Sequence, residues 1–112
     1  MPLIKETVTL AANETANPLQ GSQYEYLPWA AAVQFAILAD AGDVIRASVF
    51  SGSDVLQQES QIDTKPVADA IQFPWDYNLE DVAMAGERLG VTVTDASGLG
   101  GVVRVAVRIT PL

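Results

Sequence analysis

Apolar and polar residues alternate with a period of two along much of this chain. In the clearest stretch, 87–109, every second position is Val, Leu or Ile on both sides of a Gly-rich loop at 95–101. A period of two puts these side chains on one face of a β-strand. Two such runs joined by a Gly-rich loop predict an antiparallel hairpin. A lone hairpin is marginal in water, so the remaining chain must cover its apolar face with a second layer.

The same period predicts strands elsewhere. Leu3–Leu10 forms a first strand, 44–51 another, and 55–61 returns after a tight Ser-Gly-Ser-Asp turn. The far half of 55–61 is polar, which predicts an edge or rim position. A further strand is expected over 79–84.

Three segments are harder to interpret. Residues 11–23 hold breakers without a period and predict a loop, after which Tyr24 and Tyr26 fit a short edge strand. Residues 62–78 predict an ordered excursion, with one helical turn over 67–71.

Residues 28–41 fit either a helix that begins at Pro28 and ends at Gly42 or a strand. We favour the strand, because everything around it is strand. The strands at 28–41, 44–51 and 55–61 would then form a hairpin-connected meander.

The pattern therefore predicts an all-β fold of about seven to eight short strands. Strands at this spacing, joined by tight turns, argue for a single antiparallel β-sandwich domain over residues 1–112, jelly-roll-like in architecture.

Composition narrows the chemistry. The chain has no Cys and no His, which removes thiolate nucleophiles, zinc thiolate sites and the commonest general base. A formal net charge of −8 disfavours contact with nucleic acid. No apolar run approaches a membrane span, and the N-terminal residues do not resemble a signal peptide. A chain with 49% apolar residues and so few charges is expected to bury surface against a partner, by default another copy of itself.

The Asp and Glu residues of the sequence give little indication of a catalytic or metal site. Asp40, Asp43 and Asp54 lie at predicted turns, where bonding to the backbone explains them better than acid–base catalysis. Asp76, Glu80 and Asp81 could supply oxygen ligands for calcium, but their spacing matches no calcium loop. We expect no enzyme activity, no cofactor and no metal.

Aromatic residues are the better candidates for contact with a ligand or partner. They gather in two irregular segments, and they either plug the ends of the sandwich or form a contact surface. The candidates are Tyr24, Tyr26, Trp29, Phe73, Trp75 and Tyr77.

Segments Ser48–Gln57 and Ala83–Thr94, with the closing Val-Arg-Val strand, resemble small structural proteins of bacterial-virus particles. The resemblance implies a β-sandwich without catalytic residues that forms, cements or decorates a capsid shell. It implies a homo-oligomer, with a trimer favoured, contacts to other capsid proteins, and location in the virion after synthesis in the host cytoplasm. The alternative is a carbohydrate-binding module whose loop aromatics stack on sugars.

Overall fold

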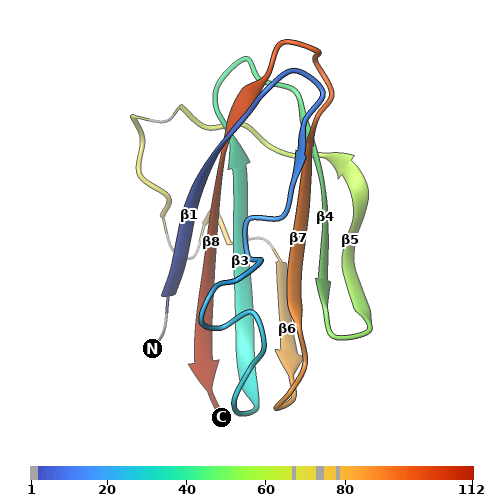
Figure 1. Ribbon diagram of the computed structural model, residues 1–112. Helices are drawn as coiled ribbons and strands as arrows, with labels where there is room; N and C mark the ends of the chain where they lie inside the picture. The colour runs from blue at the N-terminus through green and yellow to red at the C-terminus, as the bar shows by residue number, and fades with distance from the viewer. Residues whose placement is uncertain (1–2, 67, 73–74, 78) are drawn as a thin grey trace.

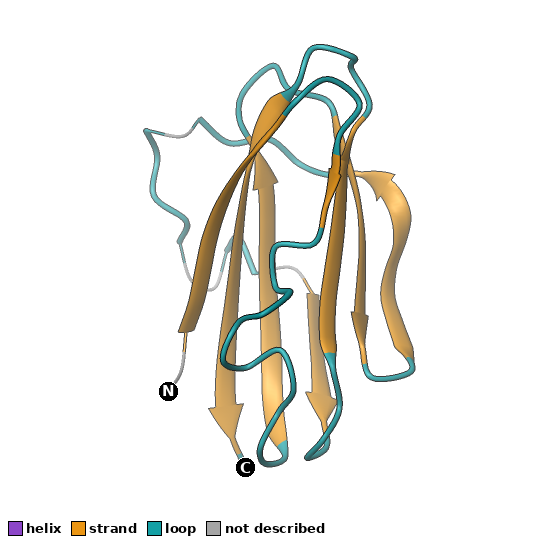
Figure 2. Ribbon diagram, in the orientation of Figure 1, coloured by secondary structure: helices purple, strands orange, loops and turns teal. Residues whose placement is uncertain are grey.

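A computed structural model describes residues 3–66, 68–72, 75–77 and 79–112 of the chain. These residues form eight strands and no helix (Figures 1 and 2). The strands are β1 (Leu3–Leu10), β2 (Thr15–Ala16), β3 (Ala31–Ala39), β4 (Ile45–Ser51), β5 (Asp54–Gln61), β6 (Leu79–Ala83), β7 (Leu89–Asp95) and β8 (Gly101–Pro111). The prediction of an all-β fold is confirmed.

The strands form two four-stranded antiparallel sheets. Sheet A has the order β1-β8-β3-β6 and sheet B the order β2-β7-β4-β5. The first strand pairs with the last, the second with the seventh, the third with the sixth and the fourth with the fifth. Successive pairs belong alternately to sheet A and sheet B. Such pairing results when one long antiparallel hairpin is rolled into two layers, which is the jelly roll. The expected sandwich architecture is therefore confirmed.

The predicted hairpin at 87–109 is wrong in its pairing. Both strands exist, but β7 pairs with β4 and β2 in sheet B, whereas β8 pairs with β1 and β3 in sheet A. The Gly-rich loop crosses from one layer to the other. The predicted meander fails for the same reason, since β3 and β4 belong to different sheets and only β4 and β5 pair as a hairpin. A period of two identifies the buried face of a strand but does not identify its neighbour.

Several local predictions are confirmed and others corrected. Residues 31–39 are a strand, and β5 lies at an edge of sheet B. Residues 15–16 form a two-residue strand inside the predicted loop, and Tyr26 makes only an isolated bridge to Arg88 in place of an edge strand. Residues 68–71 contain no helical turn, and Val67, where the turn was expected to begin, lies outside the described residues.

The core lies between the sheets and is built from the inward side chains of both layers. β3 and β8 are central in sheet A and hold fully buried residues on both faces. In sheet B, β4 and β7 supply the alternate positions that the sequence predicts to be buried. The largest fully buried side chains include Phe35, Ile45, Leu89, Ile109, Val33, Val49, Val91, Val93, Val103 and Val105.

One open side of the sandwich is closed by chain 17–30. Strand β2 is too short to shield the space between β1 and β7. Segment 17–30 crosses in front of that space (Figure 1). Leu19 and Leu27 belong to the core cluster and are 1% and 2% exposed. Glu25 fixes the segment to the start of β7, because its carboxylate accepts from Arg88 Nε at 2.8 Å and from the Gly21 amide at 2.9 Å.

The excursion after β5 covers half of the outer face of sheet A. Arg104, which points outward from β8, donates to the carbonyl oxygens of Asp69 at 2.6 Å and of Lys65 and Pro66 at 3.2 Å each. The excursion, yellow in Figure 1, passes behind the upper halves of β1, β8 and β3. Ala36, Leu38 and Ala106 face outward here by strand alternation and are nevertheless buried.

Candidate functional site

The other half of the outer face of sheet A is covered less: Tyr77 of the excursion lies near Arg108, but large apolar side chains of this half stay exposed. Its outward positions alternate with core positions on β1, β3, β6 and β8, and two further residues directly follow β6 and β8. We call this surface the open half-face. It comprises Leu3, Ala32, Gln34, Glu80, Val82, Met84, Arg108, Thr110 and Leu112.

The open half-face exposes large apolar side chains. Leu3 is 47% exposed, Val82 57%, Met84 58% and Leu112 77%, and these are four of the eight large hydrophobic residues with high exposure in the described part of the chain. Scattered exposed hydrophobics are normal on a protein surface, whereas a gathering on one sheet face marks a contact site.

The strand register arranges this surface in rows. One row crosses the sheet as Arg108–Gln34–Glu80, with Arg108 on β8, Gln34 on β3 and Glu80 on β6. The Gln34 amide donates to Glu80 at 3.4 Å. The row therefore carries a positive charge at one end and a negative charge at the other.

The neighbouring row is uncharged and has a depression at its centre. It runs Thr110–Ala32–Val82, so the short Ala32 side chain lies between two β-branched residues. The depression has a volume of about 450 Å³. Beyond it, the Leu112 amide donates to the Ala30 carbonyl, and Met84 follows β6 on the other side.

On the outer face of sheet B, the large outward residue Phe50 is covered by contacts within the chain. The Phe50 ring lies on Gly90, where a side chain would occupy the space of the ring. The Arg88 guanidinium lies 5.9 Å from the centre of that ring. Phe50 is thereby half-buried within the chain itself, although the neighbouring Val55 is 64% exposed.

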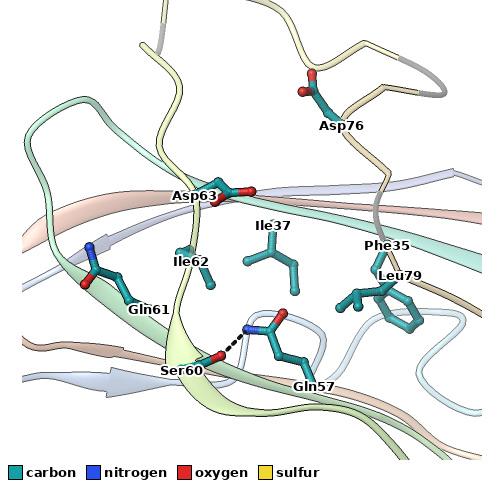
Figure 3. Close-up of a pocket in the computed structure, with 9 residues that line it drawn as sticks. All are labelled: Phe35, Ile37, Gln57, Ser60, Gln61, Ile62, Asp63, Asp76 and Leu79. Carbon is teal, nitrogen blue, oxygen red and sulfur yellow. Dashed lines mark hydrogen bonds between the residues drawn. The ribbon is translucent and has the colours of Figure 1, made fainter.

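A second candidate site is a cleft of about 260 Å³ between the sheets at the β5–β6 side (Figure 3). Phe35, Ile37, Ile62 and Leu79 supply apolar lining. Polar groups complete the lining: Gln57, Ser60, Gln61, Asp63 and Asp76.

The polar lining of the cleft is partly organised by contacts within the chain. Gln57 donates to Ser60 Oγ and to the Ala47 carbonyl, each at 3.2 Å. Asp76 Oδ2 accepts from the Gln72 amide at 2.8 Å and from Lys65 Nζ at 2.6 Å. The Gln72 amide, and then the Lys65 ammonium, hold the pKa of Asp76 below its usual range.

The predicted aromatic candidates occupy different surroundings. Tyr24 and Trp29 lie in contact, with ring centres 5.9 Å apart, and both pack against the core, as expected of residues that plug an end. Tyr26 is 60% exposed beside Arg88, and Trp75 is 75% exposed. Tyr77 is half-buried, and Phe73 lies outside the described residues.

The acidic residues considered for calcium divide between different roles. Asp76 pairs with Lys65, and Glu80 accepts from Gln34. No group of three or more acidic residues suited to a metal ion occurs in the described part of the chain. Asp40 accepts from the neighbouring Ala41 amide, in keeping with the predicted turn chemistry. Asp43 accepts instead from the Val102 amide on β8, which is distant in sequence.

Sequence reasoning missed the open half-face. Val82, Met84 and Leu112 were visible only as alternating positions in or beside strands, and the side on which the excursion folds could not be read from that alternation. Only a weak signal was present in the sequence: Val82 and Ala83 are consecutive apolar residues of an expected strand, so one of them must face away from the core.

Comparison with protein-family models, with curated proteins and with solved structures yields no match for this chain. No helix long and apolar enough to cross a membrane occurs among the residues that the structure describes.

Proposed function

We propose that this protein is a non-enzymatic structural protein of a bacteriophage virion that forms, cements or decorates the capsid shell. The open half-face carries this proposal, because exposed apolar residues gathered on one sheet face are suited to contact between folded proteins. The fold is compatible with it, since viral capsid proteins are among the users of the jelly roll. Lectin domains and cupins share the fold, so the surface and not the topology supports the choice.

The partners under this proposal are other copies of the chain, in a closed homo-oligomer, and other capsid proteins. A net charge of −8 disfavours direct contact with a packaged genome. The protein would be made in the host cytoplasm and function in the particle.

The test uses virus particles released by cells that carry the gene. Particles purified on a density gradient are analysed by quantitative mass spectrometry and by immunogold labelling with antibodies to this protein. We expect a fixed copy number relative to the major shell protein, and gold at the particle surface, while a cytoplasmic host protein of similar size stays in the supernatant. Particles that lack the protein would overturn the proposal.

A carbohydrate-binding module is the second candidate, favoured by one observation. Trp75 is 75% exposed and directly precedes Asp76, which lines the cleft between the sheets. An exposed indole beside polar groups can stack on a sugar ring while the polar groups bind its hydroxyls.

This candidate predicts binding to at least one glycan on an array and loss of that binding in Trp75→Ala. Tyr26→Ala is the matched control, because Tyr26 is also an exposed aromatic residue but lies beside Arg88. An array without hits, or equal binding by Trp75→Ala and the parent chain, argues against the module.

A further inference from the structure

We infer that the open half-face pairs with the same face of a second copy of this chain around a two-fold axis that runs along β3. This inference rests on the proposed assembly function and specifies its partner and its geometry. An apolar surface alone would leave the partner open, and the arrangement of charge on it points to a second copy.

The argument begins with the row Arg108–Gln34–Glu80. Arg108 and Glu80 lie on the two strands that flank β3, at the same level along it. A two-fold rotation about an axis along β3 exchanges the two flanks when one sheet is laid on another. Arg108 of each copy then lies over Glu80 of the other, and Gln34 faces Gln34.

The two uncharged rows beyond the charged row, Thr110–Ala32–Val82 and Leu112–Ala30–Met84, obey the same operation. Val82 comes to lie over Thr110 of the second copy, and Met84 over Leu112, while Ala32 lies on the axis. Sheets that pack face to face are twisted by about 30° relative to each other, which offsets facing rows. The contact therefore buries exposed apolar side chains and sets opposite charges against each other.

The symmetry has a direct consequence for the oligomer. An isologous contact uses the same patch on both partners and closes with two copies. The first species formed through this face is a dimer, rather than the trimer that the sequence analysis favours. Larger closed assemblies would need a second surface.

The charge pattern provides a test that separates pairing from folding. Arg108→Glu sets Glu against Glu80 of the second copy, and Glu80→Arg sets Arg against Arg108, whereas the double variant restores opposite charges with the signs exchanged. Each single reversal acts at two symmetry-related positions. We expect each to raise the dimer Kd by at least about tenfold, and the double variant to recover most of that loss.

Sedimentation velocity over a concentration series gives the Kd for all four proteins, and circular dichroism gives their fold. Val82→Asp, which introduces a charge into the uncharged row Thr110–Ala32–Val82, is expected to give a monomer. Leu99→Asp is its matched control, because Leu99 is 89% exposed in the loop between β7 and β8, away from the face. Recovery in the double variant would support the pairing even if one single variant folded poorly.

Three outcomes would overturn the inference. They are a parent chain that stays monomeric at millimolar concentration, a dimer unaffected by Val82→Asp, and a double reversal no better than the two single ones. None of them decides the proposed function, which rests on the presence of the protein in particles. A monomer that is found in virions would keep the function and reject this contact.

Discussion

The carboxylate of Asp95 organises the crossover between the two layers. The residue is 2% exposed at the end of β7, and five hydrogen bonds reach its two oxygens. One oxygen accepts from the amides of Asn13, Gly98 and Gly100, and the other accepts from the amide and hydroxyl of Ser97. The Asn13 amide, and then Ser97, hold the pKa of Asp95 well below its usual range.

Asp95→Asn is expected to destabilise the protein at neutral pH, because an amide group replaces one of the two accepting oxygens and the ionic charge is lost. The measurement is the urea midpoint of unfolding at pH 7. Asp69→Asn serves as the control, since Asp69 is exposed and only its backbone carbonyl is used by Arg104. Equal midpoints for Asp95→Asn and the parent chain would contradict the assigned role.

The pH dependence follows from the direction of the pKa shift. A carboxyl whose pKa is lower in the folded state stabilises the fold above its unfolded pKa of about 4, and this contribution is lost as the pH falls. The pKa of Glu25 is also lowered, chiefly by the Gly21 amide, and so is the pKa of Asp76. We therefore expect the parent chain to lose stability as the pH drops below about 4. The difference in stability between the parent chain and Asp95→Asn should become smaller over the same range.

At the scale of elements, the short β2 makes segment 17–30 essential to the core. This segment contributes two leucines that are almost completely buried, although it has no regular secondary structure. Loops usually lie over the surface, so their substitutions are mild, but here a loop replaces part of a sheet wall.

Leu27→Ala is expected to lower the free energy of unfolding by about 2–5 kcal/mol, the usual effect of truncating a buried leucine. Leu99→Ala, which truncates a leucine that is 89% exposed, should change it by about 0.5 kcal/mol or less. Urea titration of both variants gives the comparison. A small effect of Leu27→Ala on the free energy of unfolding would show that segment 17–30 is not needed to close this side of the sandwich.

Sequence patterns predict these elements better than they predict their partners. Alternation predicted β1, β4, β7 and β8, because burial of one face imposes a period of two wherever the strand pairs. At β3 the pattern fitted a helix as well, and the strand was favoured because of the strands around it. The same alternation cannot distinguish a hairpin from a crossover, which is why β7 and β8 were paired wrongly. The open half-face depends on where the excursion folds, and that is fixed by distant contacts such as those of Arg104 with three carbonyl groups.

At the scale of the whole molecule, net charge opposes any pairing of copies. Each chain carries −8, so two copies repel each other at long range. Salt screens charges separated by more than about 10 Å at 0.1 M, whereas charges in close, partly buried contact are screened much less.

Raising NaCl from 50 to 500 mM is therefore expected to strengthen self-association of the parent chain. Light scattering at fixed protein concentration measures the effect. Weaker association in high salt would mean that attraction between the two charged rows outweighs both the apolar contact and the repulsion between the chains.

The position of β8 has a consequence for the synthesis of the protein. It leaves the ribosome after all the other strands, yet it lies between β1 and β3 in sheet A. Until it arrives, β1 has no neighbour in that sheet and β3 has only β6, so the nascent chain presents unpaired strand edges and uncovered valine-rich surface. Pairings between segments distant in sequence also form slowly. Productive folding of this jelly roll can therefore be completed only after β8 has left the ribosome, and the period before β8 docks is when the chain is most exposed to aggregation or to the action of chaperones.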